Sequence, residues 1–347
     1  MLKTIFIKVV LLFLILVGLN LVYTFTFYKK DLADKSKEII EIQHVQKNTD
    51  VYYFGESSNI TYSSNDSTKS SISELTNLFF PSIKISAITK YGAHGGIYRH
   101  WLNEIDLAEK RPKAIVITLN LRSFDAAWIH SKLETQLQES LVFTRPYPNM
   151  VNRFLLSLQA FDNRTEQQRE QEMKKEWQTK KLVFQKPFKY ATTAEWDFAM
   201  AQGGCLKADG SWHMEKIVLA CHNIKSYAFN LDDENPRIKD FDQIADWCST
   251  NKINLYLNLM AENVEYADSL VGKELVFLMK ENRDFLVKRY SRAGCMVVDN
   301  LELVKGKNFI DQNWTTEHYD GKGRMRIAKN LADNLKNQFK NEYKPAY

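Results

Sequence analysis

A serine that could act as a nucleophile stands directly after the first short apolar run of the sequence. Residues 50–54 read DVYYF, and Gly55, Glu56 and Ser57 follow them. In an open α/β sheet, sites form beyond the carboxyl ends of the strands. A serine that starts a helix there exposes its hydroxyl beside backbone N–H groups, including its own, that suit a developing oxyanion. Serine is also a common helix cap, so the motif alone leaves that alternative open.

The base that such a serine needs could be His318, which lies in a loop before the last helical segment. A serine hydroxyl becomes a useful nucleophile when a neighbouring base takes its proton. That base in turn needs a partner that fixes its tautomer. Asp311 and Glu317 are the carboxylates close to His318 in sequence, and either could be this partner. A lone loop histidine is more often simply solvated.

Two further segments could supply donors to an oxyanion. A glycine-rich turn follows residues 83–88, and glycine lets the backbone approach a ligand closely. Asn120 lies in the segment ITLNLRSF, at the end of another apolar run. A side-chain amide there could donate to the same oxygen. The glycines of the turn are Gly92, Gly95 and Gly96.

Apolar runs and helical segments alternate along the chain, which would bring these residues to one edge of a sheet. The run at 113–121 is almost continuously apolar, as in a central parallel strand. The alternation predicts an α/β fold with a parallel sheet covered on both faces. We expect strands at residues 50–54, 83–88, 113–121, 253–260 and 295–301. We expect helices at residues 68–80, 97–109, 241–249, 274–290 and 321–339.

Residues 145–235 interrupt this alternation. They are polar and irregular in pattern, apart from a charged helical stretch at 165–181. We interpret them as an insertion over the active-site edge of the sheet, with a separate small domain as the alternative. Cys205 and Cys221 flank a short polar loop within it and could form a disulfide in an oxidising compartment. Unpaired thiols are the alternative reading.

The first 28 residues differ from the rest of the chain. The segment from Val9 to about Tyr28 carries no charge over roughly 20 residues, which is the length needed to cross a bilayer. We expect an uncleaved transmembrane anchor at 1–28, a charged stalk at 29–48 and one domain at 49–347. Lysines flank both ends of the span, so charge does not decide its orientation. A very short N-terminal tail favours an extracytoplasmic, periplasmic domain.

Composition argues against other classes of function. The net charge of +5 is dispersed, so we expect no nucleic-acid partner. The histidines show neither HxxxH nor HxH spacing and the cysteines show no CxxC, so we expect no metal site. We expect no cofactor.

The order of these motifs resembles the SGNH/GDSL hydrolase family over roughly residues 50–125 and 240–335. That family places a GDS-like motif, a glycine, an asparagine and a histidine after successive strands. The resemblance implies a flavodoxin-like three-layer sandwich with a five-stranded parallel sheet. It departs in three ways. Glu56 replaces the usual aspartate. Asn120 or Arg122 must take the role of the family's asparagine after the third strand. Thr315 stands where the catalytic acid usually lies.

The resemblance also implies a function. Ser57 would attack an ester carbonyl, and His318 would take its proton and pass it to the leaving alcohol. An anchored SGNH-like domain is similar to bacterial proteins that move acyl groups onto or off cell-envelope polymers. We therefore expect ester hydrolysis or O-acyl transfer on an envelope glycan, beside a multi-span membrane O-acyltransferase that supplies the acyl group. The alternatives are a degenerate, glycan-binding scaffold and a flavodoxin-like binding module.

Overall fold

Five parallel strands form the central sheet of the computed structural model. The structure describes all residues except 1, 46, 204–206, 208, 209, 212 and 340–347. The strands run in the order β2-β1-β3-β4-β5, and every neighbouring pair is parallel. All five expected strands are confirmed. They are β1 (Val51–Gly55), β2 (Ile85–Thr89), β3 (Ala114–Leu119), β4 (Asn254–Leu259) and β5 (Met296–Asp299).

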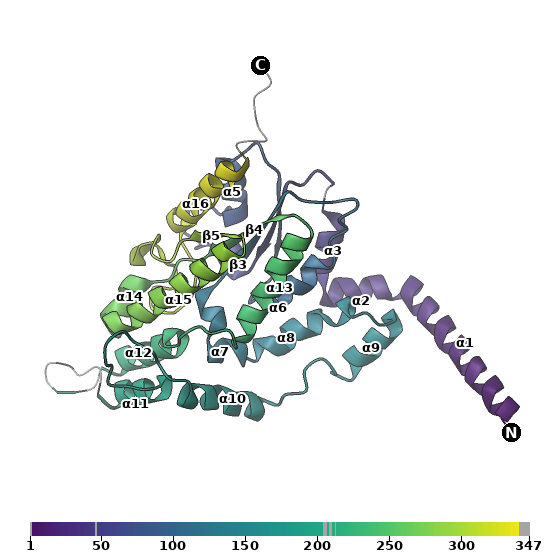
Figure 1. The fold of residues 1–347 in the computed structure, drawn as a ribbon, viewed down its shortest axis with the longest axis horizontal. Coiled ribbons are helices and arrows are strands. Elements are labelled where there is room, and N and C mark those ends of the chain that lie inside the picture. Colours follow the sequence, from purple (N-terminus) through teal and green to yellow (C-terminus); the bar gives the residue numbers. More distant parts are fainter. Residues whose placement is uncertain (1, 46, 204–206, 208–209, 212, 340–347) are drawn as a thin grey trace, which may run out of the picture.

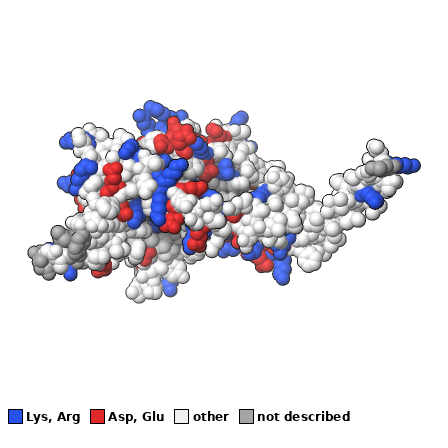
Figure 2. All heavy atoms as spheres, turned by 90° about the horizontal axis from the view of Figure 1, so that it is seen from below, with Lys and Arg blue, Asp and Glu red and all other residues white. Residues whose placement is uncertain are grey.

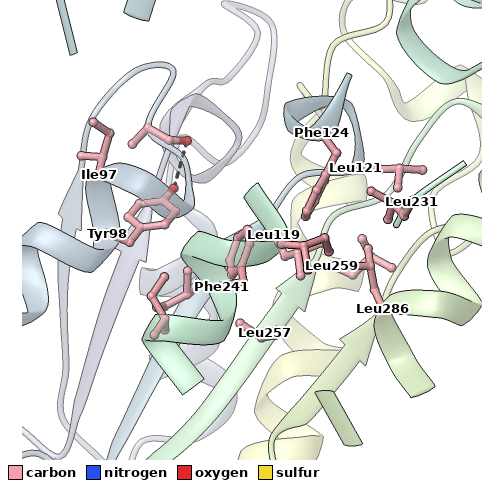
Figure 3. Packing of buried hydrophobic residues seen from close by; sticks show 14 of the residues in the cluster. Ile97, Tyr98, Leu119, Leu121, Phe124, Leu231, Phe241, Leu257, Leu259 and Leu286 are labelled. Atoms are coloured by element: carbon pink, nitrogen blue, oxygen red, sulfur yellow. Dashed lines mark hydrogen bonds between the residues drawn. The ribbon is translucent and has the colours of Figure 1, made fainter. Parts of the chain in front are cut away.

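Helices cover both faces of the sheet (Figure 1). Alternate side chains of a strand point to opposite faces, and here both sets are apolar and buried beneath helices. On one face, Phe54 of β1 and Leu257 of β4 are buried in a cluster with residues of three helices. These are α6 (Gly95–Leu102), α13 (Pro236–Thr250) and α15 (Lys273–Arg292). Figure 3 shows Leu257 and Leu259 among the side chains of this cluster, together with Phe241 and Leu286.

The other face of the sheet carries α5 (Ile72–Phe79) and α16 (Gly321–Phe339). Here Tyr53 and Val116, one position out of phase with the first face, pack with Leu331 and Leu335 of α16. The expected α/β class and parallel sheet are thus confirmed. The carboxyl ends of β1, β3, β4 and β5 lie at the same edge of the sheet, and the loops beyond them hold the candidate site.

The segment between β3 and α13 is largely helical. Residues 145–235 hold more helix than predicted, and the helical stretch predicted at 165–181 is confirmed as α10. Ile217, Ala220 and Ile224 of α12 are buried in the same cluster as the sheet residues, and α12 therefore shares the core of the domain. The elements of the segment are η1 (Leu121–Phe124), α7 (Ala126–Ile129), α8 (Leu133–Ser140), η2 (Val142–Thr144), α9 (Asn149–Ser157), α10 (Glu166–Thr179), α11 (Thr193–Gly203) and α12 (Met214–Tyr227).

The disulfide expected between Cys205 and Cys221 involves a residue outside the described part of the chain. Cys205 is not among the described residues. Cys221 is buried on α12, and its Sγ lies 3.6 Å from the carbonyl oxygen of Asp197. The pairing therefore stays a prediction.

The N-terminal helix α1 (Leu2–Thr26) extends away from the domain (Figure 1). None of its residues is buried in the domain, and its most apolar stretch has a mean hydropathy of 2.8. It is long and apolar enough to cross a membrane, a property that anchors share with signal sequences. Figure 2 shows it as an arm almost without charge between its tip and the domain, whereas Lys, Arg, Asp and Glu crowd the surface of the domain.

The expected stalk at 29–48 packs against the domain instead of standing free. It lies mainly in α2 (Tyr28–Lys35) and α3 (Lys37–His44). Leu32 and Ile39 are buried together with Val142 and Leu156, in a small apolar cluster of their own. Glu38 is buried as well and pairs with Lys90 at 3.0 Å. This segment therefore fixes how the end of α1 meets the domain.

Two shorter elements complete the described fold beyond β4. Helix α14 (Val264–Leu270) precedes α15, and its cap is the Asn263 side chain, which accepts a hydrogen bond from the Tyr266 N–H. The 3-10 turn η3 (Gly306–Asn308) follows β5 and leads into the loop that carries His318.

Candidate active site

Ser57 is the first residue of a one-turn helix, α4 (Ser57–Ile60), directly after β1. Glu56 caps this helix, since its Oε1 accepts a hydrogen bond from the Ser58 N–H at 3.0 Å. The turn from strand to helix is tight. A Cβ on Gly55 would come within 2.9 Å of the Tyr53 ring and 3.1 Å of Asn59 Cβ. The glycine before the Glu-Ser pair is therefore required sterically, and the turn leaves Ser57 partly exposed.

Ser57, His318 and Asp311 form a continuous chain of hydrogen bonds. His318 Nε2 lies 3.1 Å from Ser57 Oγ, and His318 Nδ1 lies 2.7 Å from Asp311 Oδ2. With Nδ1–H donating to the carboxylate, Nε2 is free to accept the serine proton. A nucleophile, a base and an orienting acid in this order have the geometry of a Ser-His-Asp triad. The structure thus brings together residues that are 261 positions apart.

A hairpin-like loop explains how an acid seven residues before the histidine reaches it. Phe309 and Tyr319 form an isolated antiparallel bridge. Inside the bridge, the Ile310 N–H donates to the His318 carbonyl at 2.9 Å. These bonds place the two arms side by side, so that Asp311 faces His318 across the loop. Thr316 Oγ1 also donates to Asp311 Oδ2 at 2.9 Å, which holds the carboxylate in place.

Glu317, the other candidate acid, does not contact the His318 ring. It is almost completely buried and accepts two hydrogen bonds from Arg122, at 3.1 Å from Nε and 3.0 Å from Nη2. Arg122 also stacks over the Trp128 ring, with its guanidinium carbon 4.8 Å from the ring centroid. Both residues are therefore committed to a buried ion pair. The expectation that Glu317 could orient the histidine is wrong in this geometry.

The glycines of the turn after β2 have different roles. Gly92 adopts a positive φ of 71°, which favours glycine. A Cβ on Gly95 would lie 3.1 Å from the Phe241 ring, so this glycine lets α6 pack closely on α13. The Gly96 N–H donates to His94 Nδ1 at 3.1 Å and is therefore unavailable to an oxyanion. The prediction of the Gly96 N–H as an oxyanion donor is therefore wrong, whereas Gly92 and Gly95 stay predictions.

His94 is a structural residue of this turn. It is buried and caps α6 through Nδ1, while Nε2 lies 2.9 Å from Glu134 Oε2. Because Nδ1 accepts a hydrogen bond, Nε2 carries the proton and donates to Glu134. Burial, assisted by the positive charge of Arg237, lowers the pKa of His94 to about 4, so its ring is neutral near pH 7.

Asn120 follows β3 and has one half of its amide already engaged. Its Oδ1 caps the short η1 helix by accepting from the Arg122 N–H at 3.1 Å. The cap fixes the amide plane, and the Nδ2 donor is the half that could bind an oxyanion. The neighbouring Ser123 Oγ donates to the Asn120 carbonyl at 2.7 Å, which further holds the backbone of this turn.

We expect Asn120→Ala and Asn120→Asp to reduce ester turnover by about 100- to 1000-fold each, the usual cost of losing one oxyanion donor. Aspartate keeps the oxygen that caps η1 but lacks the Nδ2 donor, so it separates loss of the donor from loss of the cap. The rates of ester hydrolysis and the thermal midpoints of both variants check this. Full activity in Asn120→Asp would remove Asn120 from the site.

Three buried glutamates, Glu56, Glu262 and Glu317, lie near the proposed triad, and Glu317 is the one that pairs with Arg122. Glu56 Oε2 accepts a hydrogen bond from Ser57 Oγ at 2.6 Å, so Glu56 competes with His318 Nε2, 3.1 Å away, for the single proton of this hydroxyl. Burial raises the pKa of Glu56, and the charge of Glu317 adds to this. Glu262 accepts from Tyr227 Oη at 2.6 Å, and its other oxygen is buried with no hydrogen-bond partner among the described residues. Sequence reasoning missed Glu262, because nothing in its local pattern marks it.

Burial, followed by the charge of Glu317, raises the pKa of Glu262 well above its ordinary value of 4.5. Between pH 4.5 and the raised value, folded Glu262 retains its proton while the unfolded residue loses it. The unfolded state then binds fewer protons, so the free energy of unfolding falls as the pH rises through this window. The stability contributed by the protonated group is complete below pH 4.5.

Glu262→Gln should therefore flatten the decline of the thermal midpoint as the pH rises above 4.5, since glutamine does not ionise and still accepts from Tyr227. The exposed Glu281→Gln on α15 is the matched control and should leave the slope of the wild type unchanged. Parallel slopes for the wild type and Glu262→Gln would show that Glu262 is ionised in the folded protein.

The inserted segment contributes a polar rim to the site. Nε2 of His222, on α12, lies 2.8 Å from Thr315 Oγ1. The His222 ring packs edge-on against the half-exposed Trp314, with 5.1 Å between the ring centroids. Burial and the positive charges of Arg122 and Lys225 lower the pKa of His222. Thr315, at the position where the acid was expected from the resemblance, thus bonds to His222. The insertion does reach the loop that holds His318.

No family model matches this chain, and no curated protein matches it. Within the described residues, no group of three or more His, Cys, Asp or Glu side chains is arranged to hold a metal ion.

Proposed function

We propose that this chain is a membrane-anchored serine esterase or O-acyltransferase of the SGNH hydrolase type. The observation that carries the proposal is the chain of hydrogen bonds from Asp311 through His318 to Ser57. The strand order 2-1-3-4-5 is that of flavodoxin-like folds, which supports the SGNH-like architecture. Ser57 follows β1 and Asn120 follows β3, on either side of the point where the strand order reverses, and His318 lies in the loop beyond β5.

The proposed reaction has two halves. In the first, Ser57 Oγ attacks the ester carbonyl, and His318 Nε2 takes its proton. The carbonyl oxygen becomes an oxyanion, which the Ser57 N–H, the Gly92 N–H and Asn120 Nδ2 would stabilise. The bond to the alcohol then breaks, and His318 returns the proton to the leaving oxygen. This leaves an acyl group on Ser57.

In the second half, water or another alcohol attacks the acyl-serine, and His318 again takes and returns the proton. Water gives hydrolysis, whereas a sugar hydroxyl gives O-acyl transfer. We propose an envelope glycan as donor or acceptor, on the strength of the resemblance and of the apolar helix α1. The helix would hold the domain on the extracytoplasmic, periplasmic side, next to a multi-span membrane O-acyltransferase.

A degenerate, non-catalytic scaffold is less well supported than an enzyme. That alternative rested on the missing acid three residues before His318. Asp311, held across the loop at 2.7 Å from Nδ1, supplies a carboxylate in that role.

Hydrolysis of p-nitrophenyl acetate by the full chain in detergent micelles tests the proposal. We expect release of p-nitrophenolate above the spontaneous rate. A soluble polysaccharide added as acceptor should divert acetate from water to sugar if the chain is a transferase. A folded protein that releases p-nitrophenolate only at the spontaneous rate would favour the scaffold.

A further inference from the structure

Helix α9 presents an apolar face that nothing in the described protein covers. Val151, Phe154 and Leu158 occur at helical spacing and are 38%, 62% and 60% exposed. The opposite side of the helix packs on the domain through Leu156, which is buried in the cluster with Leu32 of α2. The side chains thus divide into a buried face and an exposed apolar face, as in helices that lie on a membrane surface.

Helix α9 lies beside the domain-proximal end of α1 (Figure 1). The Met150 N–H donates to Asn20 Oδ1 at 3.0 Å, and Asn149 Nδ2 donates to Thr24 Oγ1 at 3.2 Å. Arg153 pairs with Asp31 at 2.9 Å. The first turn of α9 is therefore attached to the last two turns of α1, and the charged side chain of Arg153 points toward Asp31 of α2.

The length of the apolar segment places these contacts at membrane depth. Between Lys8 and Asn20 only eleven uncharged residues occur, about 17 Å of helix. A bilayer core of about 30 Å needs roughly 20 residues, so a span through α1 must continue past Asn20. A polar side chain at that depth needs a partner, because lipid tails offer none. The Met150 N–H of α9 is that partner for Asn20.

We propose that α9 is a second membrane contact, whose first turn enters the outer leaflet of the bilayer beside α1, with Val151, Phe154 and Leu158 among the acyl chains. The proposal rests on the anchoring role of α1 stated above. A second contact beside α1 would restrict rotation of the domain about the anchor. It would thereby fix the height and tilt at which the Ser57 site faces the membrane.

Photo-crosslinking to lipid tests this in the full chain. The photoreactive residue p-benzoylphenylalanine is placed at Phe154 or, in a second variant, at Leu158. The matched control has it at Phe198 of α11, which is 67% exposed and is distant from α1 in Figure 1. Each purified variant is reconstituted into nanodiscs of phosphatidylcholine that carry an alkyne on the acyl chain, and is then irradiated.

We expect lipid adducts at positions 154 and 158 in a yield several-fold above that at position 198. Yields at both positions no higher than at 198 would overturn the proposal, and so would crosslinks to a second copy of the chain instead of to lipid. Thermal midpoints of the variants confirm that the exposed substitutions leave the fold intact. If α1 is not a membrane anchor, the chain will not enter the nanodiscs at all, which distinguishes that outcome from failure of the α9 proposal. If the catalytic proposal is wrong, only the ester hydrolysis assay will show it.

Discussion

Ser57→Ala in the full chain should reduce the rate of ester hydrolysis on the order of 10⁴–10⁶-fold, as for triads of serine proteases. The hydroxyl lies 3.1 Å from His318 Nε2, and alanine leaves the base with nothing to deprotonate. His318→Ala should cost about the same, because the two groups act as one unit. Initial rates with p-nitrophenyl acetate measure both losses.

Ser58→Ala is the matched control for this experiment. Its hydroxyl is fully buried in the same turn and is not part of the chain of hydrogen bonds from Asp311 to Ser57. Its removal should leave turnover close to that of the wild type. Equal losses in Ser57→Ala and Ser58→Ala would mean that disruption of α4, and not loss of a nucleophile, explains the effect.

Asp311→Asn should lower turnover by about 10⁴-fold while the protein stays folded, as the equivalent change does in serine proteases. The asparagine amide can donate to His318 Nδ1, which would move the ring proton to Nε2. The histidine would then face Ser57 with a donor and could not take its proton. Hydrolysis rates measure the loss of turnover, and the thermal midpoint shows whether the variant stays folded.

Glu317→Gln tests which of two carboxylates, Asp311 or Glu317, orients His318, a choice that the sequence left open. Glu317 bonds to Arg122 and not to the His318 ring, so this variant should retain far more activity than Asp311→Asn. Its main effect should be on stability, because a buried ion pair loses one partner. A deeper loss of turnover in Glu317→Gln than in Asp311→Asn would reverse the assignment of the acid.

The sheet was predictable because each strand is a short apolar run between turn residues. Each of the five expected strands overlaps an observed strand, and the observed starts lie one or two residues after the expected ones. Helix α16 begins and ends where the sequence indicated. Of the inserted helices, α10 was predicted at 165–181. Helix α12 was not predictable, because it is buried on several sides and its apolar stripe is interrupted. Asn223, for example, is buried within it and bonds to the Leu219 carbonyl.

The proposed nucleophile and base could be selected from their positions relative to the strands, but their surroundings could not be predicted. The choice between Asp311 and Glu317 depends on the bridge between Phe309 and Tyr319, which is a tertiary feature. Burial decides the state of Glu262, and spacing along the chain carries no information about it. The Gly96 N–H was a plausible donor until His94 was found to occupy it.

Covalent labelling by a fluorophosphonate tests the central claim most directly, because the reagent reacts with an activated serine hydroxyl and needs no knowledge of the substrate. Peptide mass mapping of the labelled full chain should place one adduct on Ser57, and His318→Ala should prevent its formation. A folded wild-type protein with no adduct on Ser57, or with equal labelling in His318→Ala, would contradict the account.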